Sequence, residues 1–188
     1  IPTGRFDALD QTQRTLAALP PEADFETGMA ALLHLVGLAE TNVLDCRVPV
    51  RNRLPRDGRN ASSVRANEIC RRLTCSNQER HDVVWVLTYL PLLGQADKLS
   101  PAPLRRLILA GRRFRAVRAV YAARVAAGFE PLANLRALDE QVRRCGGEEF
   151  SAQPLVDGDV LRRELGVEPG THFQTILDTV FDAQLNEE

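Results

Sequence analysis

The chain has 188 residues with a formal net charge of −1, and 44% of its residues are hydrophobic. This composition predicts a folded chain of one substantial domain or two small ones and excludes an intrinsically disordered protein. The longest apolar run, residues 83–87, is too short to cross a bilayer, so no membrane contact is expected. No secretory signal pattern is recognisable, and four cysteines without C-x-x-C spacing fit reduced thiols in a cytoplasmic protein.

The nearly neutral net charge conceals a separation of charge along the chain. Residues 1–46 carry two arginines against seven acids, a net charge of −5. Residues 47–124 carry sixteen arginines and one lysine against five acids, +12, and residues 125–188 carry five arginines against thirteen acids, −8. A basic middle between acidic flanks predicts contact with a polyanion. The alternative is a solvated face whose arginines pair with the acidic ends of the same chain.

Helical periodicity dominates the first 40 residues. A first helix is expected over residues 5–19 and stops at Pro20 and Pro21, because proline cannot continue a helix. A second helix begins after Asp24, whose carboxylate can accept from the free N–H groups of the first turn. Its expected core-facing residues are Phe25, Met29, Leu32, Leu33 and Val36. The stretch 43–58 then loses periodicity and predicts a basic loop.

Two further helices are expected before residue 95. Asn60 is expected to begin the third, with its core-facing residues at Ala66, Ile69, Cys70 and Leu73. Ser76 and Glu79 form a capping box for the fourth helix, which Pro91 is expected to end. The apolar run inside this helix could also be a buried strand, but the cap before it and the lack of a partner strand favour helix.

Three helices are expected between residues 96 and 147. Pro101 or Pro103 suits the first turn of the fifth, which runs to residue 110. Gly111 separates it from the sixth, whose expected inward residues are Phe114, Val117, Val120, Tyr121 and Val125. The seventh is marked by Leu132, Leu135, Leu138 and Val142 and ends at the glycine pair 146–147. Because no segment alternates as a strand does, the predicted fold is all-α.

Residues 154–185 predict two helices joined by a tight turn. Asp157 can cap the first helix, and Gly166 can end it in the left-handed conformation. Pro169 and Gly170 turn the chain, and Thr171 with Gln174 forms a capping box for the second helix. An apolar stripe follows at Phe173, Ile176, Leu177, Val180 and Phe181.

The order of special residues in this segment resembles the C-terminal tail of CCA-adding tRNA nucleotidyltransferases and related poly(A) polymerases. The matching residues are Pro154, Leu155, Gly158, Leu161, Leu165, Gly166, Pro169, Gly170, Ile176, Leu177 and Leu185. The alternative is an ordinary helical hairpin, since Gly and Pro at such turns require no function. The chain opens on Ile1, and with this resemblance we expect a piece of a longer protein.

The segment around His34 resembles the His–Asp helix of HD phosphohydrolases, and residues 68–85 also resemble that subfamily. Leu35 occupies the place of the metal-binding Asp, and residues 35–80 contain no histidine. The literal pair His81–Asp82 lies just inside a capped helix, where charge is usually a surface feature. His34 itself is expected opposite the apolar stripe of its helix, exposed or hydrogen-bonded. We therefore expect a degenerate HD-like subdomain that holds no metal.

Nucleotidyl transfer requires paired carboxylates that hold Mg²⁺ on a rigid strand. Asp157 and Asp159 match that D-x-D spacing, but they stand at a helix start, where capping is the expected role. The resemblance implies a multi-helical body with a C-terminal helical-hairpin tail that lacks the β-containing nucleotidyltransferase head. This chain alone is then expected not to be an enzyme, with Mg²⁺ needed only in a head domain supplied in cis.

Three subdomains are expected: a degenerate HD-like helical part over 1–95, a basic helical body over 96–147 and tail helices over 148–188. The resemblance implies that they bind tRNA or tRNA-like RNA and position its 3′ end for the head. Basic charge and free N–H groups select the candidate RNA-binding residues. They are Arg105, Arg106, Arg112, Arg113, Arg115, Arg118, Arg124, Gly170 and Thr171.

Three other functions stay open from the sequence. One is a helical protein-interaction scaffold, with a homodimer held by acidic-to-basic contacts as one form of it. Another is an HD-type metal-dependent phosphohydrolase with a rebuilt site. A helix-hairpin-helix DNA binder is a lesser alternative suggested by the turn of the tail.

Overall fold

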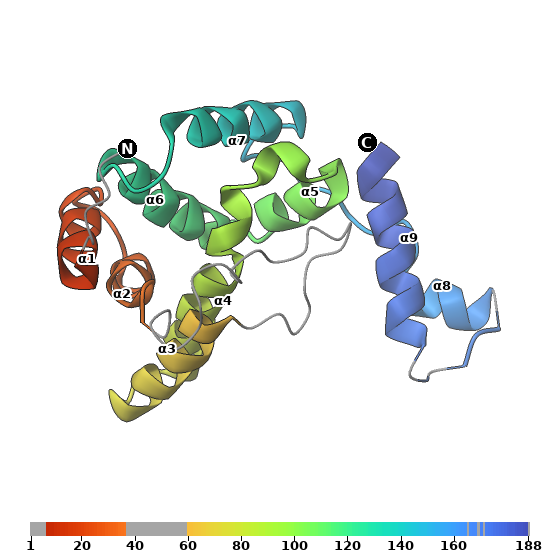
Figure 1. The fold of residues 1–188 in the computed structure, drawn as a ribbon. Coiled ribbons are helices and arrows are strands. Elements are labelled where there is room, and N and C mark those ends of the chain that lie inside the picture. Colours follow the sequence, from red (N-terminus) through yellow and green to blue (C-terminus); the bar gives the residue numbers. More distant parts are fainter. Residues whose placement is uncertain (1–6, 37–59, 165, 169, 171, 188) are drawn as a thin grey trace.

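The computed structural model describes residues 7–36, 60–164, 166–168, 170 and 172–187, and all regular structure in this part is helical (Figure 1). The predicted all-α fold is therefore confirmed for the described residues. The elements are α1 Ala8–Ala17, α2 Phe25–Leu33, α3 Ala61–Arg72, α4 Asn77–Leu93, a short 3-10 helix Ala96–Lys98, α5 Pro101–Leu109, α6 Arg112–Ala126, α7 Leu132–Arg144, α8 Gly158–Arg163 and α9 Phe173–Glu187. None of these helices is long and apolar enough to cross a membrane.

The long helix α4 lies at the centre of the body and packs against α2, α3 and α6. α7 covers α6 and the 3-10 helix, while α9 joins the body through α5 and stands to one side of it (Figure 1). A single hydrophobic core runs from Ala30 to Cys145, and its largest fully buried side chains include Tyr121, Phe114 and Leu87. This core continues across the expected boundary between residues 95 and 96.

The helix starts follow the local cap chemistry of the sequence. The Asp24 carboxylate accepts from the backbone N–H of Thr27 at 2.9 Å, and the Asn60 side chain accepts from that of Ser63 at 2.8 Å. At α4 the capping box is complete, because the N–H of Ser76 also donates to Glu79 at 2.7 Å. Pro101 is the first residue of α5, and Asp157 caps α8. These predicted starts are confirmed.

The predicted end of α4 at Pro91 is wrong, since the helix continues to Leu93. Proline has no N–H group, so the carbonyl of Leu87, four residues earlier, loses its helical donor. The side-chain amide of Asn60 donates to this carbonyl at 2.7 Å. A tertiary hydrogen bond thus replaces the missing helical one, and the helix passes through the proline.

The predicted core face of α2 is also wrong in part. Phe25 is 48% exposed and Leu32 is 46% exposed, whereas Ala30 and Ala31 are fully buried. The small alanines let α2 pack closely against α4 and α6, and this close contact turns the bulky residues outward. Leu73, predicted to face the core, is exposed because it lies at a helix end, and so is Leu132, the first residue of α7.

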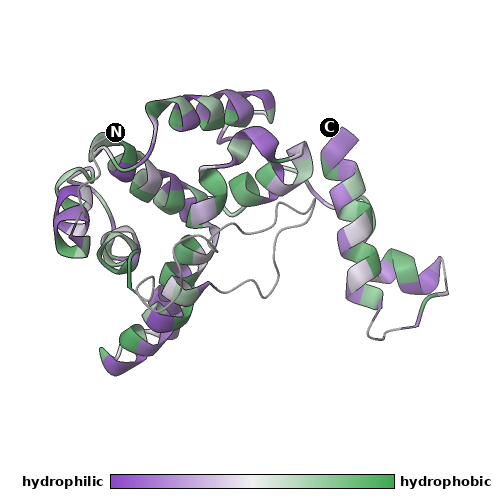
Figure 2. Cartoon of the chain, viewed as in Figure 1, coloured by the Kyte–Doolittle hydropathy of each residue, from purple (hydrophilic) through white to green (hydrophobic). Residues whose placement is uncertain are grey.

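The inward residues predicted for α6 are buried or half-buried, and Gly111 before it adopts a φ of +58°, which favours glycine. In the tail, Gly166 adopts a φ of +63°, as predicted for a left-handed helix end. The apolar stripe of α9 is only half-buried, and among the described residues of this helix Leu185 alone is fully covered. Figure 2 accordingly shows green and purple alternating along α9.

Candidate nucleic-acid interface

Helix α6 carries five arginines and no acid. Its buried side is formed by residues such as Phe114, Val117 and Tyr121, which pack into the core. The arginine side chains therefore leave the helix around the rest of its circumference. Four of the seven arginines predicted to contact RNA bind acids elsewhere in the body, on neighbouring helices or in the loop that follows α6.

Arg112 and Arg113 converge on the carboxylate of Asp82 in α4. Arg112 donates to Asp82 Oδ2 at 2.6 Å, Arg113 donates to Oδ1 at 2.5 Å, and the amide of Gln78 donates to both oxygens. Burial alone would raise the pKa of Asp82, but the hydrogen bonds from Gln78 and Arg113 and the two positive charges outweigh it. The pKa of Asp82 is thus held below its usual value.

Asp82 was expected on the surface, and its side chain is only 2% exposed. The correction has a physical reason: Asp82 lies on the same helical face as Val86 and Leu93, which are core residues. The helical spacing of Asp82 from these apolar residues is the sequence signal that would have predicted its burial. Its neighbour His81 is exposed.

Arg112 also contacts the acidic N-terminal part of the chain. It donates to Glu26 of α2 at 2.9 Å and lies 3.9 Å from Asp24. The charge of Glu26 and its hydrogen bond, with smaller contributions from Asp82, raise the pKa of Arg112. At this end of α6, Arg112 thus follows the alternative considered from the sequence, in which arginines pair with the acidic ends of the same chain.

The last two arginines of α6 bind acids on α7 and in the loops that flank α7. Arg118 donates through two nitrogens to Asp139 Oδ1, at 2.8 and 3.1 Å, and lies 3.5 Å from Glu148. Arg124 donates to Glu130 at 2.8 Å and is 17% exposed. Arg118 keeps 37% of its side chain exposed to solvent.

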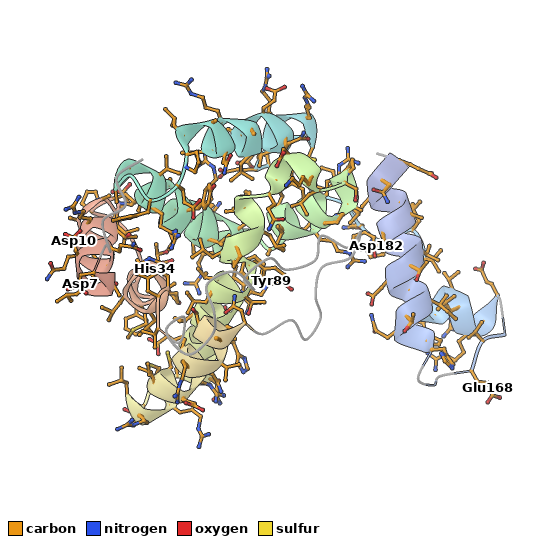
Figure 3. All side chains as sticks on the ribbon, in the orientation of Figure 1. Asp7, Asp10, His34, Tyr89, Glu168 and Asp182 are labelled. Carbon is orange, nitrogen blue, oxygen red and sulfur yellow. The ribbon has the colours of Figure 1, made fainter. Side chains whose placement is uncertain are left out.

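Arg105 and Arg106 hold the tail rather than facing solvent. Arg105 is 8% exposed, donates to the carbonyl of Leu185 at 2.7 Å and lies over the ring of Phe150. Arg106 binds Asp182 and donates to the carbonyl of Asp178 at 3.0 Å. In Figure 3, Asp182 lies on the side of α9 that faces the body. No local pattern relates α5 to α9, so this role of the two arginines cannot be predicted from the sequence.

Arg115 differs from its neighbours on α6. It is exposed, and no ion pair joins it to an acid among the described residues. Gly170 is also exposed, and its carbonyl accepts from the N–H of Phe173 at 3.0 Å. Thr171, the second candidate phosphate ligand of the turn, lies outside the described residues, as do the capping box that it would form and the basic loop 43–58.

No three His, Cys, Asp or Glu side chains in the described ranges are placed to hold a metal ion. His34, at the position of the HD histidine, is 4% exposed, and its Nδ1 lies 2.7 Å from the carbonyl of Ala31. Burial and the charge of Arg124 lower its pKa to about 4, against a smaller opposite effect of the Ala31 carbonyl. His34 is therefore a neutral, hydrogen-bonded histidine of the body.

Comparison with protein-family models, with curated proteins and with solved structures finds no match to this chain. The candidate interface therefore rests on the residues alone. They form a basic helix whose arginines are oriented by acids, with Arg115 open to solvent.

Proposed function

We propose that this chain is an RNA-binding helical module, which holds tRNA or tRNA-like RNA by its phosphate backbone and presents the 3′ end to a catalytic head. The observation that carries the proposal is the outer side of α6, where Arg115 is exposed and unpaired among the described residues and three neighbouring arginines stay partly open. Contacts of this kind recognise RNA by shape rather than by sequence.

Pairing with acids does not remove these arginines from RNA binding. A guanidinium group has five N–H donors, and Arg113 uses one of them on Asp82. The side chains of Arg112, Arg113 and Arg118 remain 52%, 36% and 37% exposed. The acids hold each guanidinium in one orientation, which lowers the entropy lost when a phosphate binds.

The tail supports the second half of the proposal, the positioning of the RNA. Three residues that carry the family resemblance are closely packed in the tail. A Cβ atom on Gly158 would lie 3.2 Å from the ring of Phe173, and Leu161 and Leu185 are buried. A tail fixed to the body through α5 can orient a bound RNA end, because remote contacts restrict its motion.

The test is tRNA binding by fluorescence anisotropy across a salt series, with Arg115→Glu as the variant. Arg112→Glu is unsuitable, because it would bring a third carboxylate next to Asp82 and Glu26. We expect wild type to bind with a steep salt dependence. The variant should bind more weakly, with a logarithmic salt slope that is shallower by about one.

Arg136→Glu is the matched control, since Arg136 is an exposed arginine of α7 without an ion pair in the described part of the chain. Absence of tRNA binding by wild type at low salt contradicts the proposal. Equal losses in the Arg115 and Arg136 variants show that α6 is not the contact surface.

A protein-interaction scaffold is the second candidate, and the outward side of α2 favours it. Phe25 and Leu32 are about half exposed there, at 48% and 46%. Self-association measured by light scattering, disrupted by Phe25→Ser/Leu32→Ser and accompanied by no affinity for tRNA, would support this function.

A further inference from the structure

Three arginines that the proposed interface does not use flank the turn between α3 and α4. Arg71 and Arg72 are exposed in the last turn of α3, and Arg80 lies in the first turns of α4. We call Arg71, Arg72 and Arg80 the hairpin-tip arginines. In Figure 1 this end of the hairpin projects from the body on the side away from α9.

The acids near the hairpin tip are already engaged. Glu79 accepts from the backbone N–H of Ser76 at 2.7 Å within the capping box, and Glu68 binds Arg65 at 2.9 Å. Among the described residues, no ion pair joins an acid to any hairpin-tip arginine. Within the described part of the chain, the Arg80 side chain donates to the neutral amide oxygen of Asn77, at 3.0 Å. This distinguishes the tip from α6, where most arginines have a carboxylate partner.

Helix stability explains the hairpin-tip arginines only in part. A positive charge near the C-terminal end of a helix interacts favourably with the helix dipole, which accounts for Arg71 and Arg72. Arg80 stands near the N-terminal end of α4, where a positive charge is unfavourable. The helix dipole therefore does not account for Arg80.

The tip is held by a defined turn. The N–H of Cys75 donates to the carbonyl of Cys70 at 3.0 Å, Thr74 adopts a φ of +56°, and Cys70 is fully buried against the core. Leu73, 57% exposed, lies between the arginines and offers an apolar contact. Three guanidinium groups at a fixed turn suit several phosphates of one strand.

We infer that the hairpin tip is a second phosphate-backbone contact for structured RNA, separate from α6; this inference rests on the proposed RNA-binding function. The tip binds phosphodiester oxygens through Arg71, Arg72 and Arg80. An RNA held there and at α6 spans the body, so that both contacts set its orientation relative to the tail.

The experiment is tRNA anisotropy across a salt series with the triple variant Arg71→Ala/Arg72→Ala/Arg80→Ala. The matched control removes three exposed arginines that pair with acids in their own helices, Arg143→Ala/Arg144→Ala/Arg162→Ala. We expect the tip variant to bind about tenfold more weakly at low salt, with a logarithmic salt slope shallower by about two. The control should stay close to wild type.

The outcomes separate this inference from the function on which it rests. If wild type binds tRNA and the tip variant matches the control, the inference is overturned and the RNA-binding function stands. If wild type does not bind, both fail. In wild type, tRNA should also protect Arg71, Arg72 and Arg80 from modification by phenylglyoxal, read by mass spectrometry. This measurement needs no variant, and unchanged modification at all three overturns the inference even if the variant does not fold.

Discussion

His34 shows how burial sets the charge of a single residue. Its side chain is enclosed at the end of α2, with Nδ1 against the carbonyl of Ala31 and Arg124 nearby. Desolvation and this positive charge both oppose protonation, and the pKa falls from 6.5 to about 4. At neutral pH the imidazole is uncharged in the folded chain and mostly uncharged in the unfolded chain, so its protonation carries little penalty there.

As pH falls below 6.5, we expect His34 to destabilise the fold. The unfolded chain then takes up a proton at this histidine that the native chain does not, until the pH reaches about 4. The free energy of unfolding should fall by up to ~1.4 kcal/mol per pH unit, and by ~3 kcal/mol in all. Urea unfolding between pH 7 and pH 4.5 should therefore show a shallower pH dependence in His34→Gln.

His81→Gln is the control, because His81 is exposed. Asp82 does not interfere, since a carboxylate with a lowered pKa contributes stability that is lost only below the ordinary value of 3.8. Identical pH dependences in wild type and His34→Gln would contradict the assignment.

Between elements, Asn60 couples α3 to α4. Its side-chain oxygen caps α3 through Ser63, and its side-chain nitrogen donates to the Leu87 carbonyl that Pro91 leaves without a helical donor. One amide thus satisfies groups of two helices. The unusual proline inside α4 and the cap of α3 depend on each other.

We expect Asn60→Ala to cost ~2 kcal/mol of unfolding free energy, about half from the cap and half from the part-buried hydrogen bond to Leu87. In a Pro91→Ala background the cost should fall to ~1 kcal/mol, because the new backbone N–H at position 91 can donate to Leu87. A double-mutant cycle by denaturant unfolding measures the difference. Asp157→Ala removes only a cap and should cost the same in both backgrounds; an equal cost for Asn60→Ala in both would rule out the coupling.

Across the whole molecule, two arginines of α5 attach the tail to the body. Arg105 donates to the carbonyl of Leu185, and Arg106 binds Asp182, donates to the Asp178 carbonyl and lies 4.9 Å from the ring of Phe181. Most of the apolar stripe of α9 remains only half-buried. The polar contacts therefore carry an unusual share of the attachment.

Arg106→Ala should loosen α9 while leaving the core of the body intact. Its ion pair with Asp182 is largely shielded from solvent, so its loss should raise amide exchange in residues 173–187 by about tenfold. Hydrogen exchange with mass spectrometry compares this segment with α4 and α6. Arg115→Ala, which removes an exposed arginine of α6, should leave both regions unchanged. An equal increase of amide exchange in α4 and α9 would show that the tail does not unfold locally, independently of the body.

Local chemistry was readable from the sequence. Asp24, Asn60 and Ser76 each accept from an N–H three residues onward, so the helix starts that they cap were predictable. The inward side of α6 followed from its apolar period, and the absence of strand-like alternation predicted the all-α fold. The RNA-binding function and the family resemblance remain predictions.

Tertiary structure decided the rest. The passage of α4 through Pro91 depends on a donor 27 residues away from Leu87 along the chain, and Arg106 meets an acid 76 residues away. The outward turn of Phe25 depends on which neighbours the alanines of α2 approach. Helix caps and apolar periodicity depend on residues that are only a few positions apart, and so both can be predicted from the sequence. The partner of each arginine depends on how the helices pack, which no short-range pattern encodes.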